Sequence, residues 1–225
     1  MKRNWRMKDL SKKQLLLAFV TFLLFMLELF SLGLLEPLLF NVTYNNYTVT
    51  QKGFHWLITA VLWFVPSIFL VRYSNRLGEK INYRGSARVT LKNWVRVGAL
   101  LFACKMITFI DWQTLKVIGE FDRKGNLYLF STQYLYYFVE VFLLLLIVVF
   151  AQKAFDIQWR DSVRVPFGGL FLAITWGAFH FVSTGGDFWN GLSCMIFSII
   201  CGWAYLYLNK NVFLFYLFLI VGYLL

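Results

Sequence analysis

The chain has 225 residues, of which 60% are hydrophobic and 20% aromatic, and its formal net charge is +11. A water-soluble domain of this size cannot bury so much apolar surface, so the composition excludes a soluble globular protein and indicates a polytopic membrane protein. The basic residues gather in particular segments between apolar runs, as membrane topology requires, so the charge does not predict nucleic-acid binding. The three cysteines all lie in apolar runs and are interpreted as small core residues rather than as a disulfide framework.

Seven apolar segments follow one another along the chain, and each is predicted to form a transmembrane helix. They cover residues 15–40, 54–71, 94–110, 133–151, 166–183, 188–208 and 212–225. The sequence therefore predicts an all-α membrane protein with a single membrane domain. Its N-terminal three-helix part spans residues 1–132, and a four-helix core spans residues 133–225. Residues 111–132 carry mixed charges, and part of this segment is predicted to lie as an interfacial helix.

Lysine and arginine concentrate in residues 1–13, 72–96 and 152–165. The positive-inside rule places these segments, and with them the N-terminus, on the cytoplasmic side. The short loops favour a bacterial plasma membrane, and an endoplasmic-reticulum membrane is the alternative. Membrane lipids are the first predicted partners, because the basic loop at 72–96 either serves as a topology determinant or also contacts anionic headgroups.

Two successive apolar segments each carry one ionisable side chain, Glu140 in the fourth and His180 in the fifth. Such a group is costly in hydrocarbon and persists only if it is paired, protonated or facing a cavity, so it marks a functional site by default. A helix rises about 1.5 Å per residue, which puts both side chains in the outer half of the membrane. Glu140 has an alternative role as a packing hydrogen bond between helices, and His180 as a helix cap or interfacial side chain.

Four further side chains fall near this pair and predict a polar pocket that opens outward. His55 and Asn190 begin the second and sixth helices, Trp176 lies one turn before His180, and Tyr137 lies just before Glu140. Each has a simpler interpretation: His55 as an interfacial residue, Asn190 as a helix-start residue, and the aromatic rings as core or lipid-facing side chains.

Lys105 lies inside the third predicted helix and requires an acidic partner, for which Glu28 and Glu140 are the candidates at similar depth. An intramembrane charge pair between Lys105 and Glu28 is therefore predicted. Two histidines and scattered carboxylates do not provide a closed ligand set at helical spacing, so the sequence predicts no metal site and no other cofactor.

The segment Trp176-Gly-Ala-Phe-His180 resembles the second motif of the CPBP (Abi) family of intramembrane proteases, which includes the CAAX prenyl endopeptidases. The spacing from Glu140 to His180 also fits that family, and Gly202-Trp-Ala-Tyr205 is similar to the helix before its last motif. The resemblance implies a CPBP-like core in which Glu140 and His180 activate a water molecule. Three features depart from the family pattern. Valines flank Glu140 where the family has a second glutamate, leucine stands where arginine is expected, and the last helix lacks the oxyanion-stabilising histidine and asparagine.

Three functions follow as hypotheses. The first is a catalytically impaired CPBP-type pseudoenzyme that binds or regulates a membrane partner, or that acts in bacteriocin immunity. The second is an active intramembrane endopeptidase for a hydrophobic or prenylated peptide, with Glu140 as general base, His180 as water orienter, and His55 or Asn190 replacing the lost groups. The third is a small transporter or channel component with a charge network of Glu28, Lys105 and Glu140, although no inverted repeat accompanies it.

Overall fold

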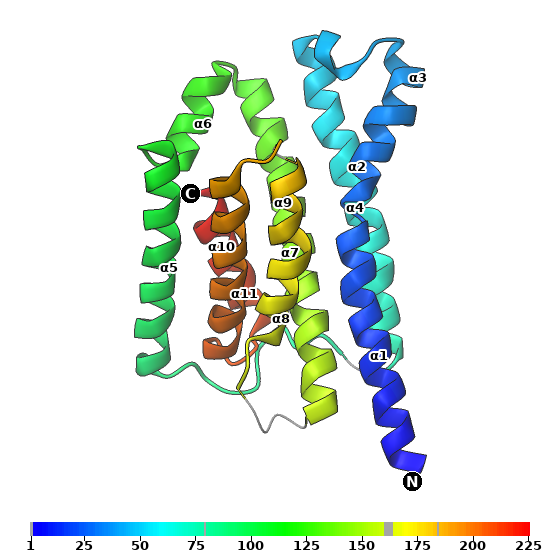
Figure 1. Cartoon of the computed structure of the whole chain (residues 1–225), viewed down its shortest axis with the longest axis vertical. Coiled ribbons are helices and arrows are strands. Elements are labelled where there is room, and N and C mark those ends of the chain that lie inside the picture. The colour runs from blue at the N-terminus through cyan, green and yellow to red at the C-terminus, as the bar shows by residue number, and fades with distance from the viewer. Residues whose placement is uncertain (1, 79, 160–163, 184) are drawn as a thin grey trace.

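The computed structural model describes residues 2–78, 80–159, 164–183 and 185–225, with side chains from residue 7 onward. The described residues contain no strand, and the helices run up and down beside one another (Figure 1). Five helical stretches in the described part of the chain are long and apolar enough to cross a membrane, as an α-helical membrane protein requires.

The helices take their bounds and labels in chain order. They are α1 (Lys2–Leu23), α2 (Met26–Phe30), the π-helix η1 (Ser31–Leu35), α3 (Glu36–Phe40), the 3-10 helix η2 (Tyr44–Asn46), α4 (Val49–Arg76), α5 (Leu91–Trp112), α6 (Lys116–Lys124), α7 (Leu127–Trp159), α8 (Phe167–Leu172), the π-helix η3 (Ala173–Gly177), α9 (Ala178–Ser183), α10 (Phe188–Tyr207) and α11 (Val212–Leu224). α1 to α3 form one long irregular helix, and α8 to α9 form another.

Five of the seven predicted segments lie in the five long helical stretches. The other two, predicted at 166–183 and 212–225, form shorter apolar helices at Phe167–Ser183 and Val212–Leu224. A membrane crossing by these two helices stays a prediction. A helix does form within the mixed-charge segment 111–132, namely α6. Part of the predicted basic segment 152–165, residues 160–163, lies outside the described residues.

α7 is the centre of the bundle, and its composition explains why. Its segment from Leu143 to Ala151 is apolar on every side, and each of these residues is at most 2% exposed. A helix that is hydrophobic all round has no face to offer to water and is stable only when other helices surround it. α1 and α4 pack on one side of α7, and α8 and α11 pack on it as well.

Three glycines allow the backbones of α7, α8 and α10 to approach closely. A Cβ atom built on Gly168 would lie 2.3 Å from the carbonyl oxygen of Val148 on α7. One built on Gly169 would lie 2.7 Å from the Cα of Gly202 on α10. Small residues at helix interfaces permit this approach where apolar association by itself provides little driving force. The glycines therefore fix α8 between its two neighbours.

The two ends of the bundle differ in the segments they hold (Figure 1). The N-terminus and the connections α4–α5, α7–α8 and α10–α11 lie at one end, which we call the basic end. The connections α3–α4 and α9–α10 lie at the other, together with α6, and we call it the α6 end. The described residues of the three predicted basic segments thus share one end, which is the arrangement that the positive-inside rule needs.

Candidate functional site

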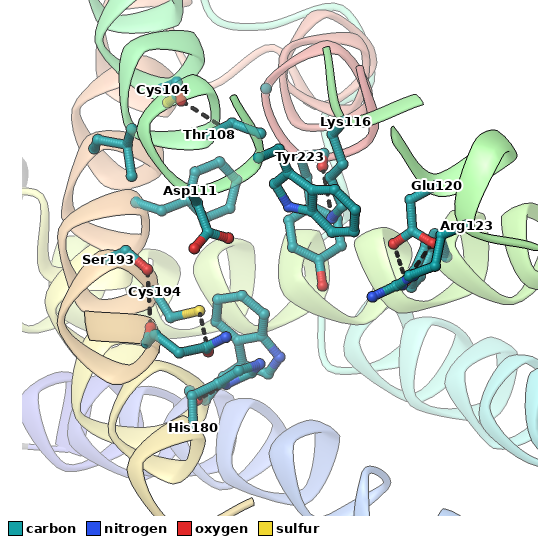
Figure 2. A pocket seen from close by; sticks show the side chains of 17 residues that line it. Cys104, Thr108, Asp111, Lys116, Glu120, Arg123, His180, Ser193, Cys194 and Tyr223 are labelled. Atoms are coloured by element: carbon teal, nitrogen blue, oxygen red, sulfur yellow. Dashed lines mark hydrogen bonds and ion pairs between the residues drawn. The ribbon is translucent and has the colours of Figure 1, made fainter. Parts of the chain in front are cut away.

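A cavity of about 300 Å³ opens at the α6 end, between α5, α6, α7, α10, α11 and the η3–α9 helix (Figure 2). Four residues of the predicted pocket line it: Tyr137 from α7, Trp176 from η3, His180 from α9 and Asn190 from α10. These side chains come from parts of the chain that are up to 53 positions apart, so the folded bundle brings together what the sequence only placed at similar depth.

His180 is held by the turn that precedes it. Its Nδ1 lies 2.9 Å from the backbone oxygen of Trp176, and the two rings are 4.4 Å apart between centroids. Because a carbonyl oxygen only accepts hydrogen bonds, Nδ1 carries the hydrogen in this contact and the tautomer is fixed. The π-helix Ala173–Gly177 includes Trp176, and such single wide turns inside α-helices occur frequently at functional sites.

Glu140 does not line the cavity. Its side chain is buried, and its Oε1 accepts a hydrogen bond of 3.2 Å from the hydroxyl of Tyr223. The Trp176 side chain lies beside the same carboxyl group. Both of these aromatic residues line the cavity, and their rings lie 5.9 Å apart between centroids. The carboxyl group therefore lies behind these two aromatic side chains and does not form part of the cavity surface.

α6 contributes charged side chains to the cavity wall, and the sequence analysis did not predict them. The Nζ of Lys116 donates to the backbone oxygen of Tyr223 at 3.1 Å and lies 4.0 Å from the centre of that ring. Glu120 is 1% exposed, and its two oxygens bind the Arg123 guanidinium at 2.8 Å and the Tyr137 hydroxyl at 3.0 Å. A signal was available, because charged residues at 116, 120 and 123 share one face of a helix.

Asp111 is the other acidic residue of the cavity wall. Its carboxyl group points into the cavity from the end of α5, opposite Arg123 (Figure 2). Apolar surface from Phe197 and Gly222 completes the wall. The arrangement combines an aromatic interior with a few charged groups near the end of the bundle, which suits an amphipathic ligand or a protein side chain.

His55 does not join the cavity as predicted. It lies in the first turns of α4, on the far side of α7 from α5, where its ring nitrogens face Glu36 at 2.9 Å and Glu28 at 3.5 Å. Depth along a helix determines neither the face nor the neighbour of a side chain, and the packing of α4 against the first long helix turns His55 toward these carboxylates.

The predicted Lys105–Glu28 pair does not form. Within the described ranges, the Nζ of Lys105 is buried and has no hydrogen-bond partner, whereas Glu28 accepts from the hydroxyl of Tyr136. α5 carries Lys105 and packs on α10, α11 and α6, while α2 carries Glu28 and packs on α4. The two helices thus lie on opposite sides of the bundle, so equal depth did not make the residues neighbours.

Among the described residues, no group of three or more histidine, cysteine, aspartate or glutamate side chains is placed to hold a metal ion. No protein-family model, no curated protein and no solved structure matches the chain.

Proposed function

We propose that this chain is a CPBP-type integral membrane protein that binds a membrane partner or hydrophobic peptide in the cavity, and that it no longer hydrolyses what it binds. The position of Glu140 carries the proposal. A general base must come within about 2.6–3.2 Å of the proton it abstracts, directly or through one water molecule. Tyr223 lines the cavity and its hydroxyl donates to the Glu140 carboxyl group, which itself does not line the cavity, so the role of Glu140 is that of a structural acceptor.

The size of the cavity supports binding of a small group. Its volume of about 300 Å³ lies at the lower end of the range for ligand pockets, about 300–1,000 Å³. A single side chain or short apolar chain fits this space, and a folded partner does not. A membrane partner would therefore insert one residue or a short segment at the α6 end.

The degenerate motifs support the loss of catalysis independently. The last helix, α11, contains neither histidine nor asparagine, so it provides no side chain of the kind that the family resemblance assigns to the oxyanion. The second candidate function is an active endopeptidase. It is favoured by the position of Trp176, because this cavity-lining side chain contacts the His180 ring and lies beside the Glu140 carboxyl group, so both predicted catalytic residues are near one point of the cavity wall.

The charge distribution supports an orientation with the basic end in the cytoplasm, and a bacterial plasma membrane as the location. The cavity would then face the outside. A cysteine placed at position 45, in the α3–α4 connection, should react with an impermeant maleimide in intact cells. One placed at position 86, in the α4–α5 connection, should react only after lysis, and the reverse pattern would contradict the orientation.

The function is tested by comparing membranes that contain the wild-type protein, Glu140→Gln and His180→Ala. Mass spectrometry identifies both the peptides released and the proteins that co-purify. Two further variants address the cavity: Ser193→Trp fills it, and Ile196→Trp places the same side chain at an exposed position of the same helix outside it.

We expect no released peptide to depend on Glu140. We expect a partner that co-purifies with Glu140→Gln and Ile196→Trp but is lost with Ser193→Trp. A product formed by the wild type and absent with Glu140→Gln would establish the endopeptidase instead. A partner whose recovery is the same with both tryptophan variants would show that the cavity is not where it binds.

A further inference from the structure

A second polar cluster lies outside the cavity, and the wide turn η1 assembles it. In an α-helix, residues five positions apart point about 140° away from each other, whereas a π-turn closes between residues i and i+5. Ser31 and Glu36 are five positions apart at the two ends of this turn, and the hydroxyl of Ser31 donates to Oε1 of Glu36 at 2.5 Å. Pro37 follows, and its lack of a backbone N–H removes one α-helical hydrogen bond at this place.

His55 lies between two carboxyl groups in this cluster. Its Nδ1 is 2.9 Å from Oε1 of Glu36, and its Nε2 is 3.5 Å from Oε1 of Glu28. The side chains of His55 and Glu36 are 3% and 0% exposed, and that of Glu28 is 28% exposed. The Tyr136 hydroxyl, on α7, donates to Oε2 of Glu28 at 3.2 Å. The cluster therefore links α2, α3 and α4 to the central helix.

The number of hydrogens decides the charge of this cluster. Carboxylate oxygens only accept, so each ring nitrogen that faces one must carry a hydrogen, and a neutral imidazole carries a single one. We propose that Glu28, His55 and Glu36 form a proton-binding site, in which His55 is an imidazolium between two carboxylates and its bound proton holds the first helices against α7 through Tyr136. The bound proton leaves the cluster with one net negative charge instead of two, which a buried site favours.

Among the described residues, no other cation compensates the charge of this cluster. In the described part of the chain, neither Glu28 nor Glu36 forms an ion pair with lysine or arginine. The second oxygen of Glu36 is buried and has no hydrogen-bond partner among the described residues. A carboxylate with one buried, unpartnered oxygen needs a positive charge nearby, and the imidazolium supplies it.

The remaining titratable neighbours are tyrosines. Tyr44 packs edge-on against the His55 ring, with ring centroids 5.3 Å apart, and Tyr47 is buried beside it. Burial and the neighbouring carboxylate of Glu36 raise the pKa of Tyr47 to about 12, and burial with both carboxylates raises the pKa of Tyr44. These two phenols therefore stay neutral, and the proton that is bound and released belongs to the cluster of Glu28, His55 and Glu36.

The site predicts a response to alkaline pH. When the proton leaves, the lone pair of a ring nitrogen faces a carboxylate and the cluster gains a second negative charge. An exposed histidine has a pKa of about 6.5, so helices that separate from α7 lose this proton above that value. Between that value and the higher pH at which His55 in the cluster loses its proton, the state with these helices packed on α7 binds one more proton than the separated state. The equilibrium constant for packing should therefore fall up to about tenfold per pH unit in this interval.

The chain contains only two histidines, which makes a direct test feasible. The full-length His180→Gln variant, labelled with ¹⁵N-histidine in lipid nanodiscs, shows His55 as its only signal. We expect both of its ring nitrogens to be protonated at pH 8, and Glu28→Gln or Glu36→Gln to move the change to neutral imidazole to lower pH. The His180 signal, seen in His55→Gln, is the control and should show a hydrogen on Nδ1 at pH 8.

A neutral His55 ring at pH 7, or a titration that neither glutamine substitution moves, would overturn the proposal.

Hydrogen exchange on the wild-type protein tests whether the proton holds the first helices against α7. Protection factors in residues 26–60 should fall from about pH 6.5 to the pH at which His55 becomes neutral and then level off, while those of α10 should not change. If the protection factors of residues 26–60 and those of α10 change with pH in the same way, the link between the cluster and α7 is refuted. Neither result depends on the proposed function, because the cluster lies outside the cavity.

Discussion

Substituting Gly169 with alanine should destabilise the protein, although alanine is normally the better helix residue. The added Cβ would lie 2.6 Å from the backbone oxygen of Ser198 and 2.7 Å from the Cα of Gly202. An ordinary carbon–oxygen contact is about 3.4 Å, so α8 would have to move about 0.8 Å away from α10. Gly168 prevents this movement, because its backbone already packs against Val148 of α7.

The expected cost of this overpacking is about 1–3 kcal/mol. Gly98→Ala is the matched control, because Gly98 lies on the exposed face of α5 and a Cβ there meets nothing within 4 Å. Both substitutions gain about 1 kcal/mol of helix propensity, so the difference between them isolates the clash. For a chain of this size, about 2–4 °C corresponds to 1 kcal/mol. Gly169→Ala should thus melt about 2–12 °C below Gly98→Ala.

The assay is thermal unfolding of the purified full-length variants in one detergent, followed by tryptophan fluorescence. Equal melting temperatures for the two variants would refute the close packing of α8 between α7 and α10. A melting temperature of Gly169→Ala above that of the wild type would show that α8 moves freely and that helix propensity dominates.

Three further substitutions test the polar interior. Tyr223→Phe removes the hydroxyl that donates to the buried Glu140, so we expect a loss of about 1–3 kcal/mol in thermal unfolding, and recovery of part of it when Glu140→Gln is added. Lys105→Met replaces an ammonium that has no hydrogen-bond partner among the described residues, and the melting temperature should rise by a few degrees; a decrease would reveal a partner. Arg123→Gln leaves the buried carboxyl of Glu120 without its cation, and limited proteolysis should cut the α6 segment several-fold faster than in the wild type.

Local patterns predicted the features that depend only on neighbours along the chain. Apolar runs predicted seven membrane-spanning helices, because hydrocarbon requires backbone hydrogen bonds within each segment. Five of these runs fall in helices long enough to cross a membrane, and the other two form shorter apolar helices. The spacing of four positions placed Trp176 beside His180, where the structure finds a hydrogen bond and a ring contact. The same logic placed Asn190 near the outer end of its helix, and it does line the cavity.

The prediction of a Lys105–Glu28 pair was wrong for a reason that applies to any helical bundle. Depth follows from the position along a helix, which the sequence contains. The neighbour across an interface follows from the order in which helices pack, and nothing local encodes that order. Glu36 shows the same limit, because its contact with Ser31 requires a π-turn that no apolar period predicts.

The sequence by itself determined that this chain is an α-helical membrane protein with ionisable groups in its apolar segments, because burial of apolar surface and backbone hydrogen bonding act on each segment separately. Only the tertiary structure decided how those groups are divided. It separated His55 from His180 by packing α4 against α7 and the first long helix and α9 against α10, paired His55 with Glu28 and Glu36, and enclosed Glu140 behind Tyr223. Side-chain partners depend on which helix faces meet, and that choice minimises the free energy of the whole bundle and not of any single helix.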